Sequence, residues 1–313
     1  MAVYEVIIIG AGIAGLSCAS KLNKNYLLIE KEREPYQHIA CAEWVPENFC
    51  APAVQKISGM VTFYPSGEKR NDFHGKMIDR KTYQQSILDS LKGAVHLGEK
   101  VLKIEGNNVV TNRGKYSAEW IVLASGPNSL INKDKNFLVA TNFRMRLTKS
   151  FNDTFIVFSP EVKMGYAWCF PKGYIANVGV GVVSEMKKAI SFCTDYFKKL
   201  GLVTGESFDR TTGLIPLSGL RTVLSGNVIS IGDAGGFIDP VTGAGIAYAQ
   251  DSGYQASQFL NGEKTKDMFL KNIKISYYKF LKRKVEKRKV FEEEWKSNLK
   301  SAVEKSWISF SRE

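Results

Sequence analysis

A glycine-rich segment near the start of the chain has the spacing of a phosphate-binding turn. Residues 10–15 read Gly-Ala-Gly-Ile-Ala-Gly, which is the pattern G-x-G-x-x-G. The segment follows a β-branched apolar run at 3–9 and precedes a predicted helix over 16–23. In such a βαβ unit the first glycine makes the tight turn and the second lets backbone N–H groups approach a pyrophosphate. The third lets the helix pack close to the strand. The context predicts a dinucleotide at this turn.

An acidic residue ends the second predicted strand, over residues 26–30. Glu30 lies twenty residues after Gly10, where a carboxylate accepts hydrogen bonds from the adenosine ribose. The same carboxylate repels a 2′-phosphate, so NADP is disfavoured at this site. The candidate nucleotide-binding residues here are Gly10, Gly12, Ala14, Gly15, Glu30 and Lys31.

A second glycine-rich element distinguishes FAD from NAD. Residues 227–231 form a short apolar run, and Gly232-Asp233 follows at the edge where open α/β sheets bind ligands. FAD needs such a carboxylate for its ribitol hydroxyls or pyrophosphate, whereas an NAD-only enzyme does not. Residues 239–246 then lead into a helix whose N-terminal N–H groups stabilise negative charge on a reduced flavin. The sequence predicts FAD, with further candidates Gly232, Asp233, Gly243, Ala244, Gly245 and Ile246.

The remaining pattern predicts an α/β protein with an inserted antiparallel layer. Strands are expected at 61–64, 73–78, 100–105, 108–111 and 120–124, with a helix over 81–91; residues 137–183 are all strand-like. Tyr166, Trp168 and Phe170 alternate along one strand and share a face. We predict an FAD-binding Rossmann-like domain over 1–135 and 205–262, with a β excursion near 45–80. A substrate-binding antiparallel sheet covers 136–204, and a basic helical tail covers 263–313.

Composition sets the protein class. The formal net charge is +12 and 44 % of residues are apolar, which excludes a disordered chain. No run approaches the roughly 20 apolar residues that span a bilayer, and a secretory signal is not expected, because no basic stretch precedes a longer apolar one. The five cysteines are scattered, so we expect a reduced cytoplasmic protein. With only His38, His74 and His96 as imidazole ligands, no metal site is predicted.

The end of the chain is helical and basic, with 15 Lys and Arg against 8 Asp and Glu in residues 261–313. A basic cluster at 282–284 and 287–289 precedes an apolar stripe, which consists of Phe291, Trp295, Leu299, Val303 and Trp307. Two interpretations remain open. The tail is a helix packed on the body with a solvated basic face, or it docks on anionic lipid at the membrane periphery. Nucleic acid is not expected, because no recognition motif accompanies the charge.

Several segments together resemble the geranylgeranyl reductase family, which is related to the FAD-dependent aromatic hydroxylases. Residues 166–173 read Tyr-Ala-Trp-Cys-Phe-Pro-Lys-Gly and 177–181 read Asn-Val-Gly-Val-Gly, which is similar to the family signature. Cys41-Ala42-Glu43 is similar to its cysteine motif, and residues 213–217 to its strand before the second flavin motif. The resemblance covers roughly residues 1 to 260.

The resemblance implies reduction of isolated C=C bonds in prenyl chains of membrane lipids or their precursors, including prenyl diphosphates. Cys41 would lie near the flavin as the catalytic proton donor, with Glu43 and Tyr166 as weaker candidates, and Arg80 would contact the cofactor. Tyr166, Trp168 and Phe170 would wall a prenyl tunnel or face a core. Lys172 would anchor a substrate phosphate or be a solvated turn lysine. NAD(P)H or a ferredoxin would donate electrons transiently.

Two other functions stay open. One is an FAD-dependent monooxygenase, although the hydroxylases' Asp-Gly pair is replaced here by Ser125-Gly126. The other is a flavin-bearing electron-transfer or binding module without a substrate of its own. The substrate head group, the number of double bonds reduced and the oligomeric state are not predicted.

Overall fold

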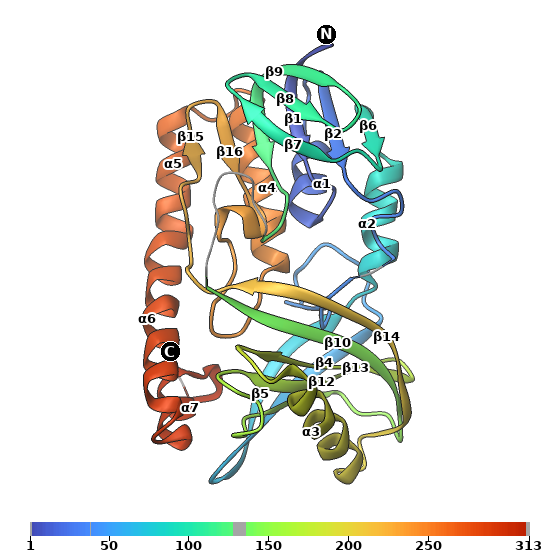
Figure 1. The fold of residues 1–313 in the computed structure, drawn as a ribbon, viewed down its shortest axis with the longest axis vertical. Coiled ribbons are helices and arrows are strands. Elements are labelled where there is room, and N and C mark those ends of the chain that lie inside the picture. Colours follow the sequence, from blue (N-terminus) through green and yellow to red (C-terminus); the bar gives the residue numbers. More distant parts are fainter. Residues whose placement is uncertain (1, 38, 128–135, 311–313) are drawn as a thin grey trace. The chain divides into compact units, whose positions relative to one another are not determined.

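A computed structural model describes residues 2–37, 39–127 and 136–310, and within it the chain forms two compact units (Figure 1). The first unit is built from the described residues of Met1–Gln37, Gln84–Asn136 and Ser218–Val285. The second is built from those of His38–Tyr83, Phe137–Leu217 and Glu286–Glu313. Each unit has a sheet of its own, which confirms the predicted combination of a parallel and an antiparallel layer.

The first unit contains a mostly parallel sheet in the order β15-β16-β9-β1-β2-β6. Its strands are β1 (Val3–Ile9), β2 (Tyr26–Glu30), β6 (Ala94–Leu97), β7 (Val101–Glu105), β8 (Asn108–Thr111), β9 (Lys115–Leu123), β15 (Leu224–Ser225) and β16 (Val228–Ser230). β1 pairs in parallel with both β2 and β9. Because the central strands are covered on both faces, they are apolar runs such as Tyr26–Glu30, which is buried throughout.

Helix α1 (Ile13–Ala19) follows the first glycine turn, and α4 (Ile246–Leu260) follows the second glycine-rich loop. Helix α1 begins earlier than the predicted residue 16, because Gly12 is already its N-cap. The two helices pack closely: a Cβ atom placed on Gly253 would lie 2.3 Å from the Ala14 carbonyl oxygen. Ser17 Oγ also donates to the Gln250 carbonyl at 2.7 Å. A glycine in α4 therefore sets the distance between the helices.

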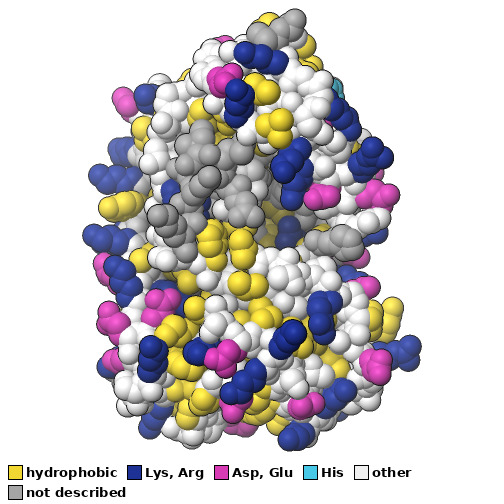
Figure 2. Space-filling view, in the orientation of Figure 1, with side chains coloured by type: hydrophobic (Ala, Val, Ile, Leu, Met, Phe, Trp, Pro, Cys, Tyr) yellow, Lys and Arg dark blue, Asp and Glu magenta, His cyan; other side chains and the backbone are white. Residues whose placement is uncertain are grey.

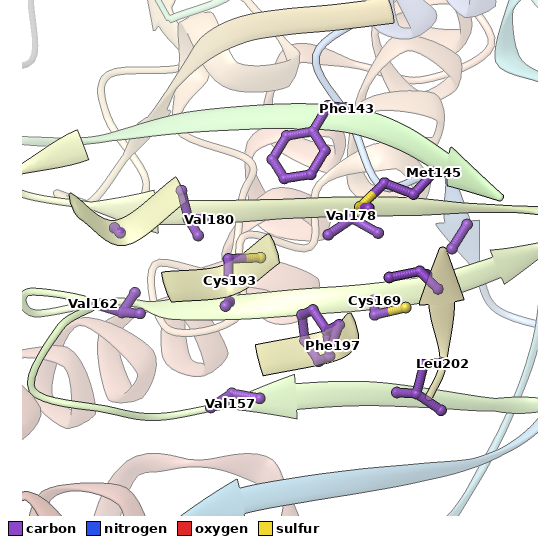
Figure 3. Close-up of a cluster of buried hydrophobic side chains, with 14 of the residues drawn as sticks. Phe143, Met145, Val157, Val162, Cys169, Val178, Val180, Cys193, Phe197 and Leu202 are labelled. Carbon is purple, nitrogen blue, oxygen red and sulfur yellow. The ribbon is translucent and has the colours of Figure 1, made fainter. Parts of the chain in front are cut away.

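The second unit contains a sheet in the order β14-β10-β13-β12-β11-β4-β5-β3. Its strands are β3 (Trp44–Val45), β4 (Gln55–Tyr64), β5 (Gly67–Met77), β10 (Phe137–Leu147), β11 (Asp153–Val157), β12 (Tyr166–Lys172), β13 (Ile175–Val182) and β14 (Val203–Pro216). Helix α3 (Met186–Lys199), which was not predicted, contributes buried Cys193 and Phe197 to the core of this sheet. Figure 3 shows these side chains among Val178, Val180 and Phe143.

The units differ from the predicted domain boundaries at two strand segments, and the predicted tail over 263–313 is divided between the units after Val285. Residues 45–80 were expected as an excursion of the FAD-binding domain, but β4 pairs in parallel with β11 and belongs to the second sheet. Residues 205–217 were assigned to the same domain, but β14 continues to Pro216 and pairs with β10. Both corrections have one cause: these strands pair with partners distant in sequence, which local patterns do not reveal.

The C-terminal segment contains α5 (Lys266–Ile273), a π-helical stretch (Lys274–Tyr278), α6 (Lys279–Trp295), α7 (Leu299–Ser306) and a short 3-10 helix (Ile308–Phe310). Helix α2 (Arg80–Asp89) and α6 each contain residues of both units. No helix among the described residues is both long and apolar enough to cross a bilayer.

The apolar stripe of the tail packs within the second unit. Phe291, Val303 and Trp307 are buried, and the Trp307 indole donates to Thr62 Oγ1 at 3.2 Å. The packed interpretation is therefore confirmed for this part of the tail. The basic face is less solvated than expected, because buried Arg288 donates to the Met164 carbonyl at 2.7 Å and pairs with Glu292.

Gly253→Ala is expected to destabilise the protein by about 1–3 kcal/mol, because the added methyl overlaps the backbone of α1. Without that overlap the same change inside a helix would stabilise by about 0.5–1 kcal/mol. Urea unfolding measures the difference, and Gly114→Ala is the control, since its nearest neighbour is the Tyr116 hydroxyl at 3.9 Å. Equal stability of the two variants would contradict the packing argument.

Candidate functional site

The first glycine turn is a close contact between backbones in the first unit. Gly10 has φ +107, and a Cβ atom there would lie 2.4 Å from the Ala124 carbonyl oxygen. A Cβ on Gly15 would lie 1.9 Å from the Gly10 carbonyl oxygen. Both positions therefore require glycine, and the turn lies directly at the carboxyl end of β1.

Glu30 holds this turn from the end of β2. Its carboxylate accepts hydrogen bonds from the Ala11 N–H at 2.7 Å and from the Glu32 N–H at 3.0 Å, and the residue is buried. Each oxygen retains a lone pair, so the predicted contact with ribose hydroxyls is compatible with these bonds. Tyr36, which was not predicted from the sequence, also holds this turn, since its hydroxyl donates to the Ala11 carbonyl at 2.9 Å. Lys31 is exposed and lies 3.4 Å from Glu32.

The second glycine motif lies against the first. A Cβ on Gly232, which has φ +56, would lie 2.8 Å from the Ala14 Cβ. The Asp233 carboxylate lies 3.6 Å from where a Cβ would stand on Gly245, the N-cap of α4. The fold thus brings together two motifs separated by over two hundred residues, as expected at the carboxyl edge of an open sheet.

Asp239 shapes the loop before α4, and the sequence analysis gave it no role. Its carboxylate accepts from the Val241 N–H at 2.8 Å and pairs with Lys284 at 3.0 Å. Its carbonyl accepts from the Gly243 N–H at 2.8 Å. An Asp followed by Pro and two nearby glycines is a local signal for such a turn, so this role was predictable.

The residues around both glycine motifs fit a bound dinucleotide. A Cβ on Gly12 would meet no atom within 4 Å, so open space adjoins the turn. Ser125, two residues after the end of β9, has a buried Oγ with no hydrogen-bond partner among the described residues. A buried hydroxyl without a partner costs about 1–3 kcal/mol, which a ligand oxygen would recover. The cradle and the unpaired hydroxyl both favour a polar ligand such as FAD.

In the second unit, the aromatic motif and the glycine motif lie on neighbouring strands. Tyr166 faces Gly181 and Trp168 faces Gly179 across the β12–β13 pair, and directly opposed residues share a sheet face. A Cβ on Gly179 would lie 2.4 Å from the Trp168 ring. Gly179 therefore makes room for the Trp168 ring.

Residues 39–43, here called the Cys41 segment, lie against the sheet of the second unit. Thr211 Oγ1 donates to the Ile39 carbonyl at 3.2 Å, and Asn177 Nδ2 donates to the Ala42 carbonyl at 2.9 Å. Cys41 is half-buried, and its Sγ accepts from the Glu43 N–H at 3.3 Å. Three motifs singled out in the sequence thus meet within one unit.

Lys172 is not a solvated turn lysine. It is 7 % exposed, and its Nζ lies 2.6 Å from Glu43 Oε2. The other oxygen of Glu43 accepts from the Arg80 N–H at 3.0 Å. The interpretation as a solvated turn lysine was wrong, because the Lys172 ammonium pairs with the carboxylate of Glu43, which is distant in the sequence.

Tyr166 and Trp168 belong to a packed aromatic cluster. They are 8 % and 5 % exposed, and Tyr166 lies with ring centroids 5.0 Å from Trp307 and 5.9 Å from Phe158. This packing supports the core alternative for the two residues, whereas Phe170 is half-buried. His38 lies outside the described residues. The candidates form one group in each unit: the glycine motifs with Glu30 and Asp233, and the Cys41 segment with β12 and β13.

Comparison with known proteins identifies related chains. Residues 141–208 match the family model of the geranylgeranyl reductase catalytic domain, and residues 4–149 match that of pyridine nucleotide-disulphide oxidoreductases. The digeranylgeranylglycerophospholipid reductase of Methanococcus vannielii is 28 % identical, covering 89 % of this chain and 84 % of the relative. That of Methanocaldococcus jannaschii is also 28 % identical, covering 93 % and 87 %.

Solved structures share the fold. A geranylgeranyl bacteriochlorophyll reductase-like protein from Thermoplasma acidophilum superposes with a TM-score of 0.81 at 21 % identity, covering all of this chain and 92 % of that one. A probable FAD-dependent monooxygenase from Pseudomonas aeruginosa has a TM-score of 0.68 at 13 % identity, covering 94 % and 97 %. Together with the sequence relatives, these matches confirm the predicted family and its cofactor, FAD. The chain is an FAD-dependent oxidoreductase that is similar to the geranylgeranyl reductases.

Proposed function

We propose that the chain reduces isolated C=C bonds in the prenyl chains of isoprenoid lipids or of their precursors. The observation that carries this proposal is the region 141–208: it matches the geranylgeranyl reductase catalytic domain, and its β12–β13 pair lies against the Cys41 segment. Relatives named as digeranylgeranylglycerophospholipid reductases support the same substrate class. When bound, reduced FAD supplies a hydride from its N5.

The first unit holds the cofactor in this proposal. Glu30 and the Gly10–Gly15 turn bind the ADP half, and Asp233 binds the ribitol or pyrophosphate. The α4 N-terminus faces the flavin ring, where its N–H groups favour negative charge. The proposed cofactor contacts in this unit are Gly10, Gly12, Ala14, Gly15, Glu30, Lys31, Gly232, Asp233, Gly243, Ala244, Gly245 and Ile246, whereas Arg80 belongs to the second unit and its role stays an expectation from the family resemblance.

The second unit supplies the proton and the apolar surface. An unactivated alkene needs a proton donor at one carbon as hydride arrives at the other. The Glu43 carboxylate is already engaged by three donors and Tyr166 is buried, which favours the Cys41 thiol as donor. Phe170, which is half-buried and lies on β12 with Tyr166, is the aromatic residue that contacts the prenyl chain in this proposal.

A monooxygenase remains the second candidate, since one fold neighbour is described as a probable FAD-dependent monooxygenase. Consumption of O2 coupled to a hydroxylated product would favour it. An electron-transfer module would be favoured if no prenyl lipid reoxidised the reduced flavin. The electron donor in our proposal, NAD(P)H or a ferredoxin, binds transiently.

The exposed face of α5 and the π-helical stretch is the proposed contact with an anionic membrane. Residues 264–284 contain eight Lys or Arg and one Asp, whereas residues 285–313 contain seven and six acids. Phe269, Ile273, Tyr277 and Leu281 face the core at four-residue spacing. Opposite them lie exposed Lys271, Ile275 and Lys279. The positive charge is therefore concentrated on the solvent face of one helical segment.

Apolar side chains accompany these lysines. Ile275 is 68 % exposed and Tyr278 is 51 % exposed. Figure 2 shows Lys and Arg side chains with hydrophobic ones between them along the edge where α5 and α6 run in Figure 1. Basic residues around an apolar centre are typical of helices that lie in a bilayer interface.

Gly12→Val is expected to leave the apoprotein as stable as the parent and to abolish FAD binding. The residue has φ −70 and its Cβ would meet no protein atom, so the side chain fills only the space proposed for the phosphates. Flavin absorbance of the purified variant, and FAD titration of apoprotein, measure the effect. Stoichiometric FAD in Gly12→Val would contradict the placement.

Cys41→Ala is expected to retain FAD and to lose roughly 10²- to 10⁴-fold in alkene reduction, the range typical of a lost general acid. Reduced enzyme is incubated anaerobically with a prenyl lipid, and mass spectrometry counts the double bonds reduced. Cys50→Ala is the matched control, because Cys50 is exposed.

Mass spectrometry of lipid bound to the purified protein tests the substrate class. A bound prenyl chain is expected, and an aromatic compound in its place would overturn the proposal.

Replacing Lys271, Lys274 and Lys279 by Glu is expected to weaken binding to anionic vesicles by at least 100-fold, at about 1 kcal/mol per basic residue. Sedimentation with anionic vesicles at low salt measures the binding affinity. The matched control replaces Lys187, Lys198 and Lys199, exposed on α3, and changes net charge equally. Equal loss in both variants, or no sedimentation of the parent chain, would contradict a defined surface.

A further inference from the structure

Glu43 is the most constrained residue of the Cys41 segment. It is 4 % exposed and has φ +64, a left-handed conformation that glycine normally adopts. A non-glycine residue in this region costs of order 1–3 kcal/mol, which surrounding contacts must offset. At Glu43 those contacts are the hydrogen bonds of its side chain and of its own backbone.

The carboxylate of Glu43 is surrounded by donors from three separate elements. Oε2 accepts from Lys172 Nζ at 2.6 Å and from Asn177 Nδ2 at 2.9 Å. Oε1 accepts from the Arg80 N–H at 3.0 Å. The Glu43 carbonyl accepts from the Ile78 N–H at 3.1 Å. Strands β12 and β13 and the start of α2 thus fix one short loop.

Asn177 is committed to the same loop at a cost. Its Nδ2 donates to both the Ala42 carbonyl and Glu43, while its Oδ1 is buried without a partner among the described residues. An unsatisfied buried acceptor costs about 1–3 kcal/mol. The amide is therefore oriented to serve the loop, although its own carbonyl oxygen stays unpaired among the described residues. This indicates that the position of the loop is strongly specified.

The left-handed backbone of Glu43 has a consequence for the thiol. It directs the Glu43 N–H at Cys41 Sγ, at 3.3 Å. If the carboxylate lost its partners, only the backbone bond from the Ile78 N–H would be left to offset the strain, and we expect the Glu43 N–H to turn away from the sulfur.

We propose that Glu43 and Lys172 form a buried positioning pair that fixes the orientation of the Cys41 thiol. Lys172 is then a positioning residue and not an anchor for a substrate phosphate, because its ammonium is already paired in a buried place. The catalytic part of the inference rests on the function proposed above for Cys41. The structural part, the orientation of the thiol, does not.

The test measures the chemistry of the thiol directly. In a Cys50→Ser background the other cysteines are buried, and burial raises the pKa of Cys18 to about 12 and also raises those of Cys169 and Cys193. A disulfide reagent then reports on Cys41 alone. Glu43→Gln is expected to change the rate of Cys41 modification at least tenfold and to shift its pH profile. It should also lower kcat for the prenyl lipid with little change in KM.

Asp209→Asn is the matched control. Asp209 also has a positive φ, +50, and is ion-paired with Arg144 at 3.0 Å, but the pair is exposed, and among the described residues no hydrogen bond or ion pair joins Asp209 to Cys41 or Glu43. The modification rate should stay at the parent value. An equal change in both variants would show a general loosening of the sheet and overturn the proposal.

The double variant Glu43→Gln, Lys172→Met separates stability from positioning, since it leaves no unpaired buried charge. Recovery of thermal stability without recovery of the Cys41 rate supports the positioning pair. Recovery of both would overturn it, as would a parent-like Cys41 rate in Glu43→Gln. If Glu43→Gln fails to fold, Lys172→Met is measured in its place with the same two outcomes. Absence of alkene reduction in every variant would contradict the proposed function but leave the thiol result valid.

Discussion

A carboxylate moved from water into a protein interior costs several kcal/mol unless donors replace its hydration. Each unit of this protein contains such a group at its candidate site. In the first unit, Glu30 accepts two backbone N–H bonds and thereby fixes the turn that carries Gly10 and Gly12. In the second, Glu43 accepts from a lysine, an amide and a backbone N–H and thereby fixes the loop that carries Cys41. Burial makes the donors obligatory, and the donors determine the loop.

Glycines recur near both buried carboxylates, Glu30 and Glu43, and they have a packing role there. Gly15 and Gly253 allow backbones to approach within the radius of a methyl group, which brings α1 against β1 and α4. Gly179 serves a different purpose, since it leaves room for the Trp168 ring, whose indole N–H donates to Asn142 at 3.1 Å. Glycine-rich motifs that look alike in the sequence therefore do two different things: they shorten the distance between backbones, and they accommodate aromatic rings.

The sequence predicted the parts of the site whose geometry is local. The strand, the glycine turn and Glu30 lie within one βαβ unit, so their spacing alone indicates a nucleotide site. Lys172 was misjudged because its partner, Glu43, lies over a hundred residues away. For the same reason β4 was assigned to the wrong sheet: its partner is β11. Tyr36 acts through a hydrogen bond to the Ala11 carbonyl, for which the sequence carries no signal, whereas the turn formed by Asp239 has a local signal in the residues that follow it.

The tail shows how one pattern contains two structures. As a whole, residues 261–313 are basic and amphipathic, a composition that suggests a single role. The structure divides the segment: residues up to 285 belong to the first unit and carry nearly all of the excess charge, while the later residues are almost neutral and carry the buried Phe291, Val303 and Trp307. Apolar burial and exposed charge make opposite demands on solvent, so a helix that meets both must separate them along its length or around its axis. Here both occur: the excess charge lies before residue 286, and within α5 and the π-helical stretch it lies opposite the buried Phe269 and Ile273, which is why the membrane contact is proposed for α5 and not for the aromatic stripe.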